Sequence, residues 1–247
     1  MESNRRDFYK NITPLGSAHG GKRIYAPVSY AAVRELQLVP IVHIEALALA
    51  AWFPICWQSS ATRPELVVLR SLREDGSCQP AGSPENVGSL PLVLRAFPFA
   101  VASPEPNADP NECHFDDTVA DRPTDIGAPI LLPDGRPGRG AQMRLRAVQA
   151  YVEARDLTDE MTDALATNDL FEPWPLDFKV ADEQLRIDGM LIVRQTAFGQ
   201  PPIQQFLVQF GAAGALFLGA HRISLFRAGN LVQAAHQRSS SRTGTAS

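Results

Sequence analysis

The chain has 247 residues, of which 45% are hydrophobic and 20% are charged, so it suits one large globular domain or two small ones. Its formal net charge is −4, and no run of lysine or arginine occurs. Nucleic acid and anionic membrane are therefore not expected as main partners, because both need clustered cations.

The cysteines and the apolar segments bear on the compartment. Cys56, Cys78 and Cys113 include no Cys-x-x-Cys pair, which favours a reducing compartment over a disulfide scaffold. The charged start lacks a secretory apolar core, and Pro and charged residues interrupt the apolar stretch at residues 36–57. We therefore predict a soluble cytoplasmic protein without a transmembrane segment.

The first half of the chain is predicted to be rich in strands. After a flexible start at residues 1–11, a short strand is expected near Ile24 and a helical turn within residues 29–37. Residues 43–52 are rich in alanine and leucine, which predicts a buried helix that Pro54 ends. Branched residues bounded by turn formers predict strands at residues 54–58 and 65–72.

The middle of the chain alternates between turn-rich and apolar segments. Loops are expected at residues 73–89 and 103–112, with a strand between them near residues 99–102. A short strand is expected at residues 113–117, and "GAPILLPDGRPG" predicts a strand that runs into a turn at Asp134.

The second half is predicted to be mixed. Apolar spacing favours helix over residues 139–171, with a second helix starting at Thr158, whose hydroxyl can cap it. Strands are expected in residues 176–195, followed by a helix that has Pro201 and Pro202 in its first turn. The run "GALFLGAHRISLF" is compatible with a buried strand or a buried helix.

These elements predict an α+β fold, with a β-rich N-terminal half and a mixed helix and strand C-terminal half in one compact unit. A single domain is expected over residues 12–236. The serine-rich tail at residues 237–247 is expected to be disordered, because it has nothing to bury.

Five segments in the same order resemble the bacterial SapC family over roughly residues 12–235. They are "ITPLGSAHGGKRI", "VPIVHIEALALAAWFPICW", "LRAFPFAV", "LLPDGRPG" with the "LTDEMTDALATNDLFEPWPLDF" that follows, and "GALFLGAHRISLFRAGNL". Ala96 departs from the pattern, because the family has a second arginine at this position, directly before its aromatic-Pro-Phe segment. The resemblance implies a link by name to bacterial surface layers, and some members carry peptide-transport labels. It implies no catalytic residues, and the chain has no phosphate-binding Gly-x-x-x-x-Gly-Lys-Ser/Thr loop.

The stretch "ECHFDD" raises the question of a metal site. His114 and Asp116 point the same way on a strand, and with His221 as a distal ligand they would form the facial triad of an Fe(II) oxygenase. A strand that ends in a solvated acidic turn, Asp116 and Asp117, is the simpler interpretation and the one favoured, because His-x-Asp is common by chance.

Other polar residues have similar alternatives. His43 and Glu45 are either an acid–base pair or a structural pair within the core, and the structural role is favoured. Cys56 is expected to be buried and inert. No serine lies in a Gly-x-Ser-x-Gly elbow.

Two sets of residues are candidates for binding. Arg95, Phe97 and Phe99 could line a groove for a peptide or an aromatic side chain, although packing of both rings in the core is favoured. His221 and Ser224 would share one face of a helix, where they mark a pocket or satisfy one another.

The function predicted from sequence is therefore a binding or accessory protein of the SapC type, more an interaction protein than an enzyme. Its partner would be a peptide or protein in a cell-envelope or uptake pathway, and no cofactor is expected. The alternatives are the Fe(II) oxygenase with His114 and Asp116 as ligands, and a scaffold that assembles with itself or with a neighbouring enzyme.

Overall fold

The structure is a computed structural model that describes residues 9–10, 12–16, 19, 21–74, 90–100 and 114–243, with side chains through residue 240. The chain forms two compact units, each built from separated segments. Unit 1 contains residues 36–89 and 154–247, and unit 2 contains residues 2–35 and 90–153. Helix covers 48% and strand 22% of the described residues, which confirms the α+β prediction. The single domain at residues 12–236 stays a prediction.

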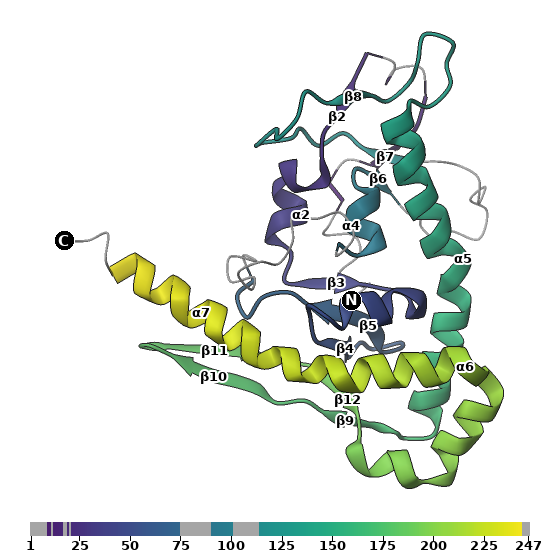
Figure 1. The fold of residues 1–247 in the computed structure, drawn as a ribbon, viewed down its shortest axis with the longest axis vertical. Helices are drawn as coiled ribbons and strands as arrows, with labels where there is room; N and C mark the ends of the chain where they lie inside the picture. Colours follow the sequence, from purple (N-terminus) through teal and green to yellow (C-terminus); the bar gives the residue numbers. More distant parts are fainter. Residues whose placement is uncertain are drawn as a thin grey trace. The chain divides into compact units, whose positions relative to one another are not determined.

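Unit 1 is built on a five-stranded antiparallel sheet (Figure 1). Residues 66–69, in the strand Glu65–Leu69, are all buried, so both faces of the sheet are covered at this point. The predicted strands at residues 54–58 and 65–72 are confirmed. The strand order is β3 (Leu38–Pro40), β5 (Glu65–Leu69), β4 (Ile55–Gln58), β12 (Met190–Val193) and β9 (Phe171–Pro173).

A long hairpin and the last helix extend this unit. The strands β10 (Leu176–Val180) and β11 (Glu183–Ile187) pair with one another, and α7 (Ala228–Thr243) contacts β10. Leu231 and Ala235 of α7 belong to the same buried cluster as Leu176 and Ile187 of the hairpin. Helix therefore includes residues 237–243, part of the segment for which the sequence predicted disorder.

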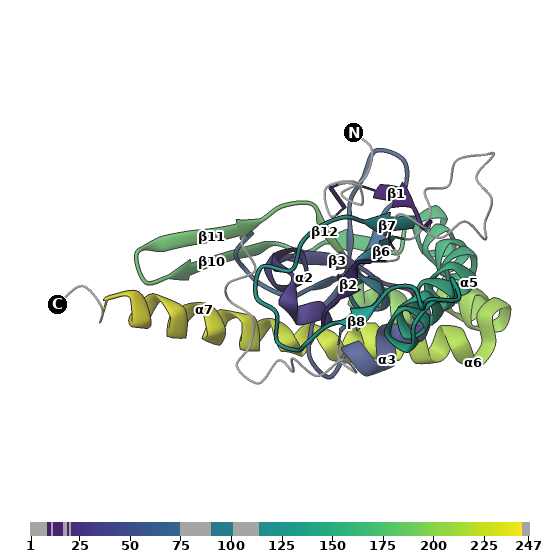
Figure 2. The same ribbon diagram turned by 90° about the horizontal axis from the view of Figure 1, so that it is seen from above.

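Two helical elements lie together in unit 1. The single turn η3 (His43–Glu45) leads into α3 (Ala46–Leu49), and both contact α6 (Pro201–Ser224) (Figure 2). The run "GALFLGAHRISLF", which sequence left open between strand and helix, is helical, because Phe217, Ala220 and Ser224 recur at helical spacing on its buried side. The backbone of Gly211 is not helical (φ 55°, ψ −138°), so α6 consists of two helices joined at this residue.

The helix α5 (Arg139–Thr167) is continuous over 29 residues. The prediction that a second helix starts at Thr158 is wrong. Instead of capping a new helix, the Thr158 hydroxyl donates to the carbonyl oxygen of Ala154, four residues earlier and 2.7 Å away. The helix ends at Thr167, four residues before the end of the predicted helical region at residue 171.

Unit 2 holds short strands and helices around a small aromatic core. Its core cluster contains Ile24, Phe99, Phe115, Ile130 and Ala141, with the first half of α5 packed against it through Leu145 and Val148. Its strands are β1 (Ile12–Pro14), β7 (His114–Asp116) and β6 (Phe99–Ala100) in one sheet, and β2 (Arg23–Ile24) with β8 (Ala128–Pro129) in another. Its helices are η2 (Pro27–Ser29), α2 (Ala31–Glu35) and α4 (Leu92–Ala96).

Several predictions fall on residues that are not described. They are the flexible start at residues 1–8, most of the two predicted loops (75–89 and 103–112), the positions 101, 102 and 113, and with them Cys78 and Cys113.

Candidate functional site

His221 of α6 is fully buried and bridges two strands of the unit 1 sheet. Its Nε2 accepts the N–H of Val193 at 3.2 Å, which fixes the ring proton on Nδ1. Nδ1 then donates to the carbonyl oxygen of Ile55 at 2.8 Å. The register of β4 and β12 pairs Met190 with Gln58 and Leu191 with Trp57, so continuing it would place Val193 opposite Ile55. The imidazole therefore stands where a direct bond between these two backbone groups would have been.

Burial and charge keep this histidine neutral. Desolvation lowers the pKa of His221 to about 4, and the nearby Arg222 acts in the same direction, while the bond to the Ile55 carbonyl opposes both. A protonated ring could no longer accept from Val193. The bridge is therefore a property of the neutral side chain.

Ser224 completes the same contact from the next turn of α6. Its Oγ accepts the N–H of Ile55 at 2.8 Å and donates to the carbonyl oxygen of His221 at 2.6 Å. Both side chains have no exposed surface, so neither offers an atom to a partner at the protein surface. The two residues proposed from sequence as part of a binding pocket instead hold β4 on α6.

The candidate metal ligands of unit 2 are also engaged in backbone contacts. Asp116 is fully buried, and its carboxylate accepts the N–H of Lys10 at 2.7 Å and the hydroxyl of Thr118 at 2.6 Å. The favoured interpretation of a solvated acidic turn is therefore wrong for Asp116. It holds for Asp117, which is half exposed and forms an ion pair with Lys22 at 2.5 Å.

A distal ligand for these residues is not provided by His221. Both of its ring nitrogens are occupied by backbone groups, so binding iron would require breaking the bridge between Val193 and Ile55. Within the described ranges, no group of three His, Cys, Asp or Glu side chains is close enough to hold a metal ion. His114 is half-buried at the start of β7.

The aromatic candidates for a groove lie in the core of unit 2. Phe97 stacks on Tyr9 at 6.0 Å and meets Tyr30 edge-on at 5.0 Å between ring centroids. Phe99 meets Phe115 edge-on at 5.5 Å. Neither Phe97 nor Phe99 has exposed surface, so they pack inward rather than line an open groove. Arg95, at the end of α4, is half-buried.

His43 and Glu45 have separate structural partners. The Glu45 carboxylate accepts the N–H of Val42 at 2.9 Å, which anchors the start of the η3 turn. The oxygen of Thr158 accepts the backbone N–H of His43 at 3.0 Å and lies 2.9 Å from Nδ1 of its ring. Burial lowers the pKa of His43. These contacts support the structural role that sequence favoured over an acid–base pair.

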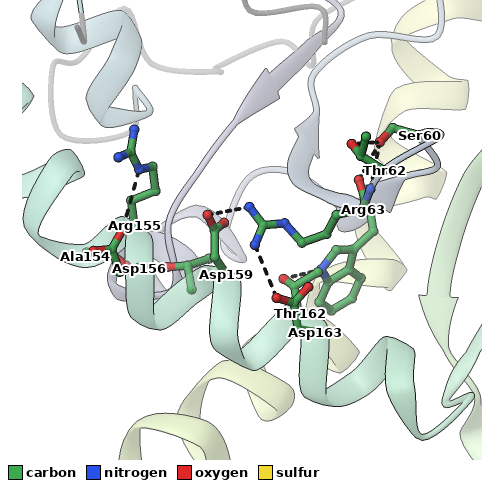
Figure 3. Close-up of polar contacts among 11 residues, drawn as sticks. Ser60, Thr62, Arg63, Ala154, Arg155, Asp156, Asp159, Thr162 and Asp163 are labelled. Carbon is green, nitrogen blue, oxygen red and sulfur yellow. Dashed lines mark hydrogen bonds and ion pairs between the residues drawn. The ribbon is translucent and has the colours of Figure 1, made fainter. Parts of the chain in front are cut away.

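Within unit 1, the second half of α5 forms polar contacts through two rows of side chains, each with four-residue spacing. Figure 3 shows Asp159, Thr162 and Asp163 of these rows. In the buried row, Thr158 accepts the backbone N–H of His43, and Thr162 accepts the indole N–H of Trp57 at 3.1 Å. In the more exposed row, Asp159 and Asp163 form ion pairs with Arg63 at 2.6 and 3.3 Å. These contacts were not predicted from the sequence, although the four-residue spacing places each pair on one helix face.

Cys56 is buried as predicted, with its Sγ 3.9 Å from the sulfur of Met190. Desolvation raises the pKa of its thiol to about 12, so the reactive thiolate does not form near neutral pH.

Large apolar side chains remain exposed on η3, α3 and the turn that follows α3. Others are exposed on the second half of α6 and on the short helix η6 (Leu225–Arg227) that follows it. The exposed fractions include 62% for Leu47, 62% for Ile223 and 85% for Phe226. Because α3 and α6 contact one another, their exposed rows belong to neighbouring helices. We call this set the α3–α6 face; its members are Ile44, Leu47, Trp52, Leu216, Ile223 and Phe226.

The prediction of a buried helix at residues 43–52 is therefore only half right. Ala46, Leu49 and Ala50 are buried, whereas Ile44, Leu47 and Trp52 are exposed. The sequence shows that these residues are apolar, but a helix that is apolar on more than one side does not reveal which side faces the core.

A family model for SapC matches residues 16–225 of the chain. The chain belongs to the SapC family. The SapC match includes both α3 and α6 and ends before α7. It confirms the resemblance found in the five sequence segments. No curated protein and no solved structure matched the chain.

Proposed function

We propose that this SapC-family chain is a binding or accessory protein without a reaction of its own. It would dock through the α3–α6 face onto another component of a cell-envelope or uptake pathway. A peptide or protein is the component expected from the sequence. The proposal includes no cofactor and a cytoplasmic location, with which a buried free thiol at Cys56 is compatible.

The observation that carries this proposal is the gathering of exposed apolar side chains on two helices in contact. Single exposed apolar residues are common on proteins, but neighbouring rows of them mark interaction surfaces. Ile44 of η3, Leu47 of α3, Leu216 and Ile223 of α6, and Phe226 of η6 are each more than half exposed. Fully burying one such side chain contributes roughly 1.5–3 kcal/mol, so a partner that covered several of them would bind stably.

The contacts of the polar candidates support a docking role over a catalytic one. His221, Ser224, Asp116 and Glu45 each bind backbone groups of the fold. These hydrogen bonds explain why a polar residue occurs at each of these positions in the core.

Site-specific photo-crosslinking in cells tests the proposal. A photoreactive phenylalanine analogue is placed at Leu47 or at Ile223, and in the matched control at Ile126, an exposed apolar residue of unit 2. We expect crosslinked products, with a peptide, a protein or lipid, from positions 47 and 223 and not from position 126. Equal yields at all three positions, or no product from the α3–α6 face, would contradict the proposal.

A further inference from the structure

The charges of the chain are distributed unevenly along the sequence. Residues 201–247 contain four arginines, Arg222, Arg227, Arg238 and Arg242, and no aspartate or glutamate. They carry +4, which leaves −8 on residues 1–200, because the whole chain carries −4. The C-terminal segment, which contains Leu216, Ile223 and Phe226 of the α3–α6 face, is thus basic in a protein that is acidic as a whole.

The charged side chains next to the apolar residues of α6 and η6 in the sequence are both arginines. Arg222 precedes Ile223 and Arg227 follows Phe226, and both are half-buried. Arg222 donates to the side-chain oxygen of Gln195 at 2.7 Å, and Arg227 donates to the carbonyl oxygen of Ala50 at 3.3 Å. These contacts hold the two guanidinium groups beside the apolar rows. The carboxylate of η3, Glu45, is buried and bound to Val42.

We propose that the α3–α6 face seats the protein on the surface of an anionic lipid bilayer. This inference rests on the proposed function of the face as a docking surface and names its occupant. The apolar side chains enter the boundary between headgroups and acyl chains, while Arg222 and Arg227 contact lipid phosphates. Trp52, which is 38% exposed, suits the headgroup level, because its ring is apolar and its indole N–H is polar.

The helices lie on the bilayer and do not cross it. Among the described residues, one helical stretch, Pro201–Ser240, is long and apolar enough to span a membrane by composition. However, Gly211 breaks this stretch, and the opposite side of α6 packs inward through Phe217, Leu218 and His221. The exposed apolar row from residue 212 to residue 226 would be about 22 Å long at 1.5 Å per residue, shorter than the roughly 30 Å of a hydrocarbon core.

The expectation that anionic membranes are not partners came from the net charge of the whole chain. Peripheral membrane binding depends on the charge next to the inserted side chains, since fields are screened over about 8–10 Å at physiological salt. The charged residues that flank Ile223 and Phe226 in the sequence, Arg222 and Arg227, are positive although the net charge of the chain is −4.

Sedimentation of the full chain with vesicles tests the inference. The vesicles contain phosphatidylcholine alone or a mixture with phosphatidylglycerol. We expect binding to the anionic vesicles that is at least tenfold stronger than to the neutral ones and that weakens as salt is raised. Brominated lipids should quench the fluorescence of Trp52, and this quenching should be absent in the variant Trp52→Phe.

Variants of the chain test whether the α3–α6 face is the part that binds the vesicles. Leu47→Glu with Ile223→Glu should reduce binding to anionic vesicles at least tenfold, and Arg222→Gln with Arg227→Gln should remove the preference for anionic lipid. The matched controls Val119→Glu and Ile126→Glu, at exposed apolar residues of unit 2, should bind as the unchanged chain does. Circular dichroism of each variant confirms that it is folded.

Three results would overturn the inference. The first is failure of the unchanged chain to bind anionic vesicles, and the second is equal binding by the Leu47→Glu, Ile223→Glu variant. The third is a dimer, or a crosslinked peptide or protein, that depends on the α3–α6 face without any vesicle binding. This third result would leave the proposed docking function intact and replace only its occupant, whereas an inert face would remove both.

Discussion

The imidazole of His221 lies between Val193 and Ile55, with Nε2 3.2 Å from one backbone nitrogen and Nδ1 2.8 Å from the other residue's carbonyl oxygen. A side chain of α6 thus takes over the hydrogen bonding of two strands where their ladder stops. One residue thereby joins a helix to the centre of the unit 1 sheet.

Removing this side chain should destabilise the protein strongly. His221→Ala leaves the N–H of Val193 and the carbonyl of Ile55 buried without this partner, at a cost of about 1–3 kcal/mol for each group. We expect the free energy of unfolding, measured with urea, to fall by about 3 kcal/mol or more. The control His236→Ala changes an exposed histidine of α7 and should be within about 0.5 kcal/mol of the unchanged chain.

The same histidine should make stability depend on pH. Its pKa is about 4 in the folded protein and about 6.5 when unfolded, so the unfolded chain binds more protons between these values. The stabilisation is fully present above about pH 6.5 and is lost as the pH falls towards 4, by up to about 3 kcal/mol. His43, whose pKa is also lowered, acts in the same direction.

Urea unfolding at several pH values between 7.5 and 4 measures this dependence. Comparison with His221→Gln isolates the contribution of His221, because His43 is common to both proteins. An equal slope of stability against pH in the two proteins would contradict the assignment.

The contact between Trp57 and Thr162 should depend on one hydroxyl group. Thr162→Val keeps the shape of the side chain but leaves the buried indole N–H without its acceptor, which costs about 1–3 kcal/mol. Thr162→Ser keeps the oxygen and should be clearly more stable than the valine variant in thermal unfolding. If the two variants unfold at the same temperature, the hydrogen bond contributes nothing measurable.

The ion pairs of Arg63 should contribute little. The Arg63 side chain is 39% exposed, and exposed pairs of this kind contribute about 0.2–1 kcal/mol. A double-mutant cycle with Arg63→Ala and Asp159→Ala should give a coupling energy in this range that shrinks in high salt. A coupling above about 2 kcal/mol, insensitive to salt, would show that the pair is effectively buried.

Ala181 offers a stabilising substitution. It lies in the two-residue loop between β10 and β11 with φ at 53°, a conformation that costs a residue with a Cβ roughly 1–2 kcal/mol. Ala181→Gly removes this strain and loses about 0.4–1 kcal/mol through the freer unfolded chain, for a net gain of about 0.5 kcal/mol. Ala166→Gly, inside α5, should instead lose about 1 kcal/mol in the same unfolding experiment.

The sequence was sufficient to predict those strands and helix starts that neighbouring residues define. The strands at Ile55–Gln58 and Glu65–Leu69 follow from branched residues between turn formers, and Pro201 and Pro202 correctly mark the start of α6. The family was also recognisable, because its short segments occur in one order along the chain.

Thr158 shows why local patterns fail inside a long helix. A threonine followed by two carboxylates has the composition of a helix start, but the same hydroxyl can bond to the carbonyl four residues earlier and leave the helix intact. The same oxygen also accepts the backbone N–H of His43, a residue that is distant in sequence and is brought next to Thr158 only by the fold.

The sequence by itself therefore determined the α+β class, the strands of the central sheet and membership of the SapC family, because short-range spacing and segment order carry that information. Tertiary structure alone decided that His221 and Ser224 are buried and bind the backbone of β4, and that Leu47 and Ile223 face outward. The physical reason is that an apolar helix has more than one apolar row, and only packing against the rest of the chain selects the row that is buried.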